Sequence, residues 1–169
     1  MFVGREKELS TLNKRKSAHN ASFVVLKGRR RIGKSRLIQE YAKGFSQSYF
    51  FTGLPPTKGT SAQDQRDEFI RQMGEQGLPK LKGDDWGDLF WMLSKACEKG
   101  PVLIALDEIS WMGSKDPTFL GKLKIAWDTY FESNAKLVLV IAGSISSWID
   151  KNILKSTGFV GRIDLTMVL

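Results

Sequence analysis

The feature that most limits the fold of this chain is the segment GRRRIGKS at positions 28–35. It follows the apolar, β-branched run SFVVL at 22–26 and precedes a segment with apolar residues at helical spacing, beginning with Leu37 and Ile38. The spacing fits G-x-x-x-x-G-K-[ST], a loop between a strand and a helix whose backbone N–H groups surround phosphates. The three consecutive arginines leave a second interpretation open, a basic run that binds nucleic acid.

Apolar runs elsewhere predict the other strands of a sheet. VLIAL at 102–106 and LVLVIA at 137–142 are nearly unbroken, which is typical of strands buried on both faces of a parallel sheet. SYFFT at 48–52 and IDLTMVL at 163–169 are weaker strand candidates. Segments with helical spacing of apolar residues lie between these runs. This alternation predicts a doubly wound α/β sheet with right-handed crossovers.

Length and composition limit the class of protein. A chain of 169 residues with 41% hydrophobic residues predicts one domain, residues 1–169, with a substantial core. The net charge of +8 predicts a polyanionic binding partner, such as nucleotide phosphate, nucleic acid or an acidic membrane surface. No run approaches the ~18 apolar residues of a membrane span, so we expect a soluble, cytoplasmic protein with no membrane partner. The single cysteine, Cys97, cannot form an internal disulfide and agrees with a reducing compartment.

Two segments suggest how the domain is bounded. Residues 53–83 are rich in Gly, Pro, Lys and Gln and contain one short apolar patch, so we expect an insertion or mobile connection around a small helix. The final run at 163–169 is apolar, whereas chain ends are usually exposed and polar. We therefore expect the chain to be part of a longer protein.

The loop motif assigns roles to individual residues. Gly28 and Gly33 allow backbone conformations and close approaches that a side chain would block. Lys34 is expected to reach the β- and γ-phosphates, and the Ser35 hydroxyl to bind Mg²⁺. The other residues of this segment assigned to the nucleotide site are Arg29, Arg30, Arg31, Ile32 and Arg36. Arg29, Arg30 and Arg31 occupy variable positions of the motif, whose side chains mostly point away from the phosphates. The sequence does not decide whether they contact the nucleotide, acidic groups or nucleic acid.

Polar residues follow two of the buried strands. Asp107 and Glu108 end the run VLIAL, at the strand end where parallel sheets bind ligands. We expect Asp107 to hold Mg²⁺ directly or through water, and Glu108 to orient or deprotonate an attacking water. The alternative is that this pair only opens a solvated loop. Ser144 follows LVLVIA and is expected near the γ-phosphate as a polar sensor, although helix capping by Ser144, Ser146 or Ser147 stays open.

The segments FVGREKEL, GRRRIGKS, LDEISWM, AGSISSWI and GFVGRIDL together resemble the archaeal-type ATPase family, within the AAA+ and STAND-like P-loop ATPases that are also found in bacteria. The resemblance spans nearly the whole chain. It implies ATP and Mg²⁺ as cofactors, with the Walker A and Walker B motifs at the loop and at the Asp-Glu pair. It also implies a three-layer sandwich around a five-stranded, mostly parallel sheet with strand order 5-1-4-3-2.

The resemblance implies further roles outside the loop. Gly4 and Arg5, within FVGRE at 2–6, are expected near the adenine, and Ser144 takes a sensor position that is usually Asn or Thr. Arg162 resembles an arginine that completes the site of a neighbouring subunit, which implies a homo-oligomer; the alternative is a surface arginine paired with Asp164 or another local carboxylate. Family members continue into a helical or winged-helix lid after the last strand, and this sequence stops there.

Three functions agree with these observations. The first is an ATP-hydrolysing module that couples hydrolysis to a domain or subunit rearrangement. The second is a nucleotide-sensing switch that binds ATP or ADP with little turnover, and the third is a nucleic-acid-associated module in which ATP is secondary. Glu108 favours hydrolysis, because a pure sensor needs no base.

Overall fold

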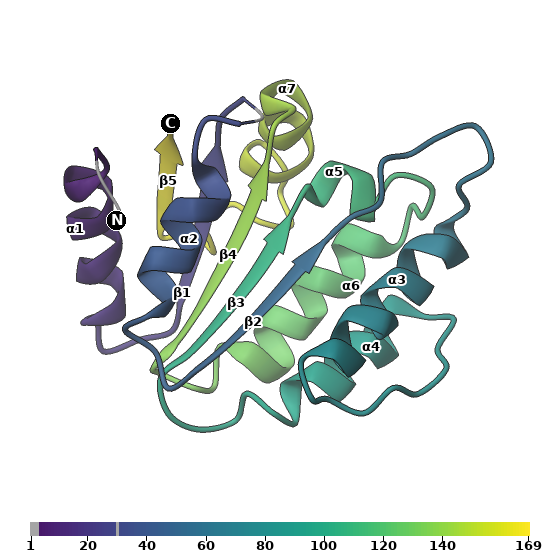
Figure 1. Cartoon of the computed structure of the whole chain (residues 1–169), viewed down its shortest axis with the longest axis horizontal. Coiled ribbons are helices and arrows are strands. Elements are labelled where there is room, and N and C mark those ends of the chain that lie inside the picture. The colour runs from purple at the N-terminus through teal and green to yellow at the C-terminus, as the bar shows by residue number, and fades with distance from the viewer. Residues whose placement is uncertain (1–3, 30) are drawn as a thin grey trace.

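The computed structural model describes residues 4–29 and 31–169 of the chain. Five parallel strands form one sheet in the order β2-β3-β4-β1-β5. Their bounds are β1 Ser22–Lys27, β2 Gln47–Thr52, β3 Val102–Asp107, β4 Leu137–Gly143 and β5 Leu165–Val168. Seen from its other edge, this is the predicted order 5-1-4-3-2, so the predicted fold class is confirmed (Figure 1).

Helices cover both faces of the sheet and complete the three layers (Figure 1). One face carries α1 (Glu6–Lys16) and α2 (Lys34–Ala42). The other carries α3 (Ala62–Glu75), α4 (Trp86–Ser94), α5 (Ile109–Met112), α6 (Phe119–Ala126) with the π-helical turn η1 (Trp127–Phe131), and α7 (Ser146–Ile149) with the π-helical turn η2 (Asp150–Leu154). In the part of the chain that the structure describes, no helix combines the length and apolar character that a membrane crossing needs.

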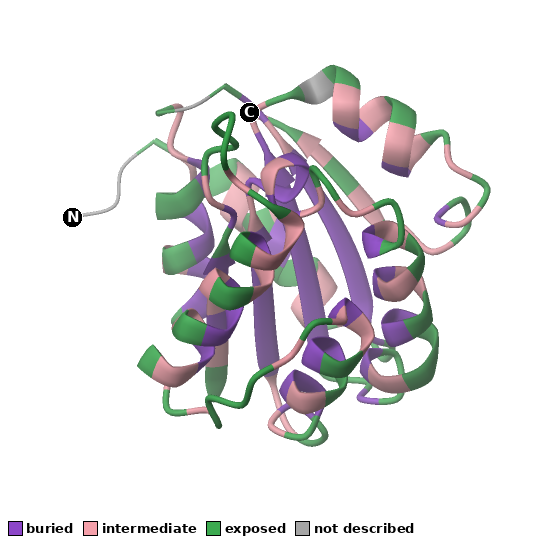
Figure 2. Ribbon diagram, turned by 90° about the vertical axis from the view of Figure 1, so that its right-hand side faces the viewer, coloured by how far each residue is buried: buried purple, intermediate pink, exposed green. Residues whose placement is uncertain are grey.

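The core lies on both sides of the central strands. Phe23 and Val25 of β1 face the layer of α3, α4 and α6, whereas Val24 and Leu26 face α1 and α2. Every residue of β4 is buried, and Figure 2 shows the central strands as a continuous buried layer. Burial on both faces explains why these strands read as unbroken apolar runs in the sequence.

Helix α1 was not predicted from the sequence. Its charges suit a helix, with Glu6 and Glu8 in the first turn and basic residues in the last. Such charges oppose the partial charges at the two ends of a helix. Leu12 is buried against the sheet face, and its carbonyl accepts a 2.7 Å hydrogen bond from the Tyr41 hydroxyl of α2. This short apolar stripe was too narrow to stand out among charged residues.

The prediction for residues 53–83 was wrong about the size of the helix. This segment contains α3, which has 14 residues and is the longest helix in the described chain. Ser61 and Asp64 form a capping box at its start, and Phe69, Ile70 and Met73 are buried in the core. The segment is therefore an integral layer of the fold.

Glutamines of α3, together with its C-cap residue Gln76, cover the outer edge of β2 and the segment just after it, which would otherwise expose unpaired backbone groups. Each amide accepts a hydrogen bond from a backbone N–H and donates one to the C=O of the same residue, at 2.7–3.1 Å. The pairs are Gln76 with Phe50, Gln72 with Thr52, and Gln65 with Leu54. We call this set the glutamine clamp. The clamp holds β2, whose last residue, Thr52, pairs with Asp107 of β3.

Candidate nucleotide-binding site

The loop between β1 and α2 has the backbone conformation that an anion cradle needs. Gly33 has φ +97° and Arg31 has φ +64°, so the chain turns through the left-handed region twice within three residues. A Cβ atom on Gly28 would lie 3.1 Å from the Ile32 side chain and 3.2 Å from Leu169. Gly33 thus has a backbone conformation that favours glycine, and Gly28 lies where a side chain would be crowded; their part in binding phosphate stays a prediction.

Lys34 lies inside the curve of this loop. Its side chain is buried, and its ammonium donates hydrogen bonds to Gly28 O at 2.9 Å and to Arg29 O at 3.2 Å. A cation in this position faces the space that the loop encloses. The predicted contact of Lys34 with the β- and γ-phosphates stays a prediction.

Ser35 and Asp107 meet at the carboxyl end of the sheet although 72 residues separate them. The Ser35 hydroxyl donates to Asp107 Oδ2 at 3.1 Å, and the Glu108 backbone N–H donates to Oδ1 at 2.8 Å. A hydroxyl and a carboxylate are oxygen ligands of the kind that Mg²⁺ binds, usually together with waters and substrate phosphates. Among the described residues, no three His, Cys, Asp or Glu side chains form a metal-binding group. The donor set therefore fits a magnesium ion that takes its other ligands from phosphate and water.

Glu108 starts the α5 turn in a left-handed conformation, with φ +50°. Its side chain is buried, and its Oε2 accepts a 3.1 Å hydrogen bond from the Ser144 hydroxyl. Ser144 follows β4, which lies between β1 and β3, so its position depends on the strand order. Both residues were expected at this edge of the sheet from the sequence, but the hydrogen bond between them was not predicted. The sensor role of Ser144 stays a prediction, and the side chain of Ser146 lies outside the described part.

A cavity of about 500 Å³ opens between these groups. Its lining residues are Arg31, Gly33, Lys34, Ser35, Arg36, Thr52, Asp107, Glu108 and Trp111. This volume lies within the usual range for small-molecule sites. Thr52 and Trp111 were not predicted as site residues. The pairing of β2 with β3 sets Thr52 opposite Asp107, and only this pairing would have identified Thr52.

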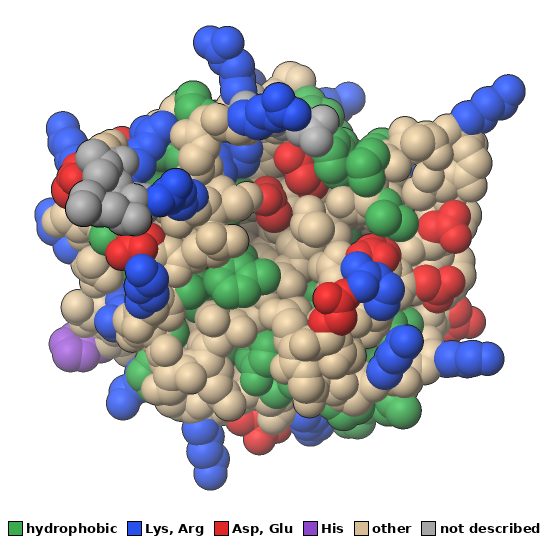
Figure 3. All heavy atoms as spheres, in the orientation of Figure 1, with side chains coloured by type: hydrophobic (Ala, Val, Ile, Leu, Met, Phe, Trp, Pro, Cys, Tyr) green, Lys and Arg blue, Asp and Glu red, His purple; other side chains and the backbone are tan. Residues whose placement is uncertain are grey.

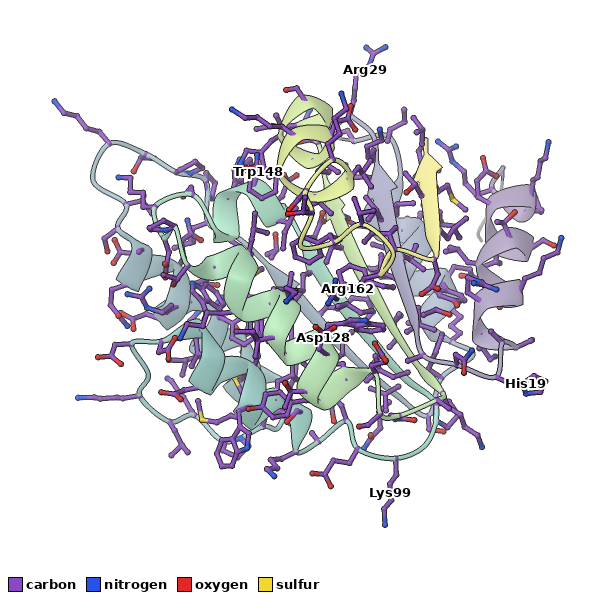
Figure 4. The ribbon with its side chains drawn as sticks, turned by 180° about the vertical axis from the view of Figure 1, so that it is seen from behind. His19, Arg29, Lys99, Asp128, Trp148 and Arg162 are labelled. Carbon is purple, nitrogen blue, oxygen red and sulfur yellow. The ribbon has the colours of Figure 1, made fainter. Side chains whose placement is uncertain are left out.

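The arginines of the loop segment differ in where they lie. Arg29 projects from the molecule into solvent (Figure 4), as expected for a variable loop position. Arg31 and Arg36 line the cavity instead. Arg30 lies outside the described residues. Arg29, Arg31 and Arg36 are exposed, and we call these three arginines the basic rim. Lys and Arg side chains also project along the upper edge of the molecule (Figure 3).

Gly4 and Arg5 lie at the start of α1, and the structure brings Arg5 onto the loop. Gly4 has φ +93°, and its N–H donates to Glu6 Oε1 at 3.3 Å. The Arg5 guanidinium donates to Ile32 O at 2.9 Å and to Glu8 Oε1 at 3.2 Å. Their expected position near an adenine stays a prediction, and residues 2 and 3 lie outside the described part.

Arg162 lies away from the loop, on the face opposite α1 and α2 (Figure 4). Its guanidinium binds both carboxylate oxygens of Asp128, at 2.8 and 2.9 Å, and also donates to Gly158 O. This hydrogen bonding lowers the pKa of the Asp128 carboxyl below its ordinary value. Asp164, the alternative partner named from the sequence, accepts instead from the Phe23 N–H. A role of Arg162 in a neighbouring site stays a prediction.

The sheet order, the loop after β1 and the carboxylates after β3 define an α/β domain of the P-loop NTPase class. The sequence matches the family described as AAA domain over residues 15–149, and the chain belongs to this family. The predicted archaeal-type P-loop family is thereby confirmed.

Known relatives agree with this assignment. An uncharacterized protein of Methanocaldococcus jannaschii is 26% identical over 156 residues, which cover 91% of this chain and 32% of that protein. The structure of the Aeropyrum pernix ORC2 protein in ADPNP and ADP complexes has a TM-score of 0.66 at 17% identity, over 99% of this chain and 48% of that one. A Walker-type ATPase of Pyrococcus abyssi gives 0.64 at 16% identity, over 99% and 53%. The chain thus spans a third to about half of these proteins, and the two structures show the shared fold.

Proposed function

We propose that residues 1–169 form the nucleotide-binding domain of an AAA+/STAND-like ATPase that binds Mg-ATP and hydrolyses it. The observation that carries the proposal is a series of hydrogen bonds across the cavity. The Ser35 hydroxyl donates to one oxygen of Asp107, the Glu108 backbone N–H donates to the other, and the Ser144 hydroxyl donates to the Glu108 carboxylate. These residues come from α2, β3 and the end of β4, and they link a phosphate loop to a buried carboxylate.

The loop is the proposed phosphate-binding element. The backbone N–H groups of Gly33, Lys34 and Ser35, at the start of α2, attract anions, and Lys34 adds a charge inside the curve. Arg31 and Arg36 line the same cavity and supply further positive charge. The Aeropyrum pernix relative, which shares this fold, is described in complex with ADPNP and ADP, and this supports an adenine nucleotide as the ligand.

Ser35 and Asp107 are the proposed magnesium ligands, because their oxygens already lie 3.1 Å apart at the mouth of the loop. A magnesium ion held there neutralises charge on the β- and γ-phosphates. Asp107 is fixed for this task by the Glu108 N–H, which occupies its other oxygen.

Glu108 is the proposed general base. Ser144 fixes one carboxylate oxygen, Oε2, and we assign the other oxygen, Oε1, to accept the proton of the attacking water. Burial and the hydrogen bond hold the carboxylate in one orientation, which a base needs if it is to align a water with the γ-phosphate. Ser144 acts in this scheme through Glu108.

Calorimetric titration of Mg-ATP tests the binding step. Lys34→Ala should weaken binding by at least about 100-fold, which corresponds to about 2.7 kcal/mol, since charge-assisted hydrogen bonds to phosphate are lost. Lys43→Ala is the matched control, because Lys43 is an exposed lysine at the other end of α2. Unchanged affinity in the Lys34 variant would contradict the proposed site.

Two alternatives share this nucleotide site. A switch with little turnover would bind Mg-ATP but hydrolyse it no faster in the wild type than in a Glu108→Gln variant. A nucleic-acid-associated module would show strongly salt-dependent binding of DNA or RNA through the basic rim, including Arg29. A cytoplasmic location, assembly through Arg162, coupling to a rearrangement and a lid beyond this domain belong to the same proposal.

A further inference from the structure

Arg5, at the start of α1, binds the loop between β1 and α2. Arg5 Nη2 donates a 2.9 Å hydrogen bond to the carbonyl of Ile32, which lies 27 residues away in the sequence. Ile32 stands between two residues in the left-handed region, Arg31 at φ +64° and Gly33 at φ +97°. Because glycine tolerates many backbone conformations, the peptide between Ile32 and Gly33 can adopt more than one orientation, and this bond selects one of them.

The geometry of the peptide unit connects this carbonyl to the cavity. No cis peptide bond occurs in residues 4–29 and 31–169, so the C=O of Ile32 and the N–H of Gly33 point in opposite directions. A hydrogen bond that holds Ile32 O toward Arg5 therefore turns the Gly33 N–H the other way. Gly33 lines the cavity, and its N–H is one of the donors from which a phosphate cradle is built.

Arg5 is itself fixed by α1. Its second guanidinium nitrogen binds Glu8 Oε1 at 3.2 Å, and its carbonyl accepts the Leu9 N–H at 2.9 Å. Helix α1 lies beside α2 (Figure 1) and is joined to it by the bond between Tyr41 and Leu12. The anchor of the loop is thus a helix packed on the sheet, on the same face as the helix that follows the loop.

We propose that Arg5 is a positioning residue for the phosphate loop. Through its bond to Ile32 O, Arg5 fixes the direction of the Gly33 N–H, and it thereby affects binding of the nucleotide's phosphates without contacting the base. The inference rests on the proposed function. It differs from the expectation that Arg5 binds near the adenine. The two roles separate by ligand: a loop-positioning residue affects every ligand that carries the phosphate chain, whereas a base contact affects only ligands with adenine.

The test measures the affinities of Mg-ATP and of magnesium tripolyphosphate for the same set of variants. Arg5→Ala should weaken both ligands by the same factor, about tenfold, so that their affinity ratio stays within about twofold of the wild-type ratio. Glu8→Gln, which loosens the guanidinium without removing it, should weaken both by a smaller common factor. Lys7→Ala removes an exposed charge from the same helix and should leave both affinities unchanged.

Each other outcome has a definite meaning. Loss of ATP affinity with unchanged tripolyphosphate affinity would overturn the inference in favour of a base contact. Unchanged affinity for both ligands in Arg5→Ala would also overturn it and leave the proposed function intact. A wild-type protein that binds neither ligand would refute the proposed function itself. If Arg5→Ala lowers the melting temperature strongly, Arg5→Lys and Glu8→Gln carry the comparison.

Discussion

Gln65 is the most deeply buried member of the glutamine clamp and lies close to the candidate site. It is 2% exposed, and its amide accepts the Leu54 N–H at 2.9 Å and donates to Leu54 O at 3.0 Å. The neighbouring Gly53 N–H donates to Asp107 O, and a Cβ on Gly53 would lie 2.9 Å from Glu108 O. The clamp therefore fixes the segment that packs directly against the backbone of Asp107 and Glu108.

Replacing Gln65 with Leu keeps a similar volume but removes both hydrogen bonds. The N–H and C=O of Leu54 then lose their partners, and each buried, unsatisfied group costs about 1–3 kcal/mol. Because Leu54 is partly exposed, we take values near the lower end and expect a loss of about 2–3 kcal/mol in the free energy of unfolding. For a domain of this size the melting temperature should fall by about 5–10 °C.

Urea unfolding followed by circular dichroism measures this loss directly. Gln39→Leu is the matched control, because Gln39 is an exposed glutamine of α2 and its replacement should change stability by less than about 0.5 kcal/mol. A Gln65→Leu variant as stable as this control would refute the claim that the clamp holds the edge of the sheet.

Three further predictions concern single side chains. Asp128→Asn should lower the melting temperature by a few degrees at pH 7, because Arg162 holds the pKa of Asp128 below its ordinary value and thereby stabilises the fold. The difference should shrink as the pH falls below the ordinary Asp pKa of about 3.9 and vanish only below the lowered pKa of Asp128; melting curves at several pH values test it. Burial raises the pKa of the Cys97 thiol to about 12, so Ellman's reagent should modify the native protein at least about tenfold more slowly than the urea-unfolded chain. Ser144→Ala should reduce ATP turnover by about ten- to 100-fold and leave Mg-ATP affinity within about threefold, since Ser144 acts through Glu108; an equal loss of affinity would contradict this.

The sheet was predictable because its signals are local. Unbroken apolar runs such as 102–106 and 137–142 have few alternatives to buried strands, and the glycine and lysine spacing of 28–35 fixes the loop between strand and helix. The length of α3 was not predicted, because its polar face carries glutamines that resemble loop composition. Those glutamines bind the backbone of a distant strand, and no local pattern reveals that partner.

Most residues of the candidate site could be predicted from the sequence, but most of the hydrogen bonds between them could not. Ser35 and Asp107 follow from the motif and from the convergence of parallel strand ends. The bonds from Ser144 to Glu108, from Arg5 to Ile32 and from Arg162 to Asp128 were not predicted. Each joins segments at least 27 residues apart, so it depends on how the elements pack, which composition and spacing do not encode.

Single-turnover hydrolysis by a Glu108→Gln variant tests the central claim most directly, because the substitution removes the proposed base and leaves the proposed metal ligand Asp107 in place. With protein in excess over radiolabelled Mg-ATP, the variant should bind nucleotide within about threefold of the wild-type affinity and release phosphate at least about 100-fold more slowly. Glu98→Gln, at an exposed glutamate, should match the wild type in both measurements. Equal rates of phosphate release in the wild type and the Glu108 variant, with Mg-ATP bound to both, would contradict the assignment of Glu108 as the base and with it the proposed ATPase mechanism.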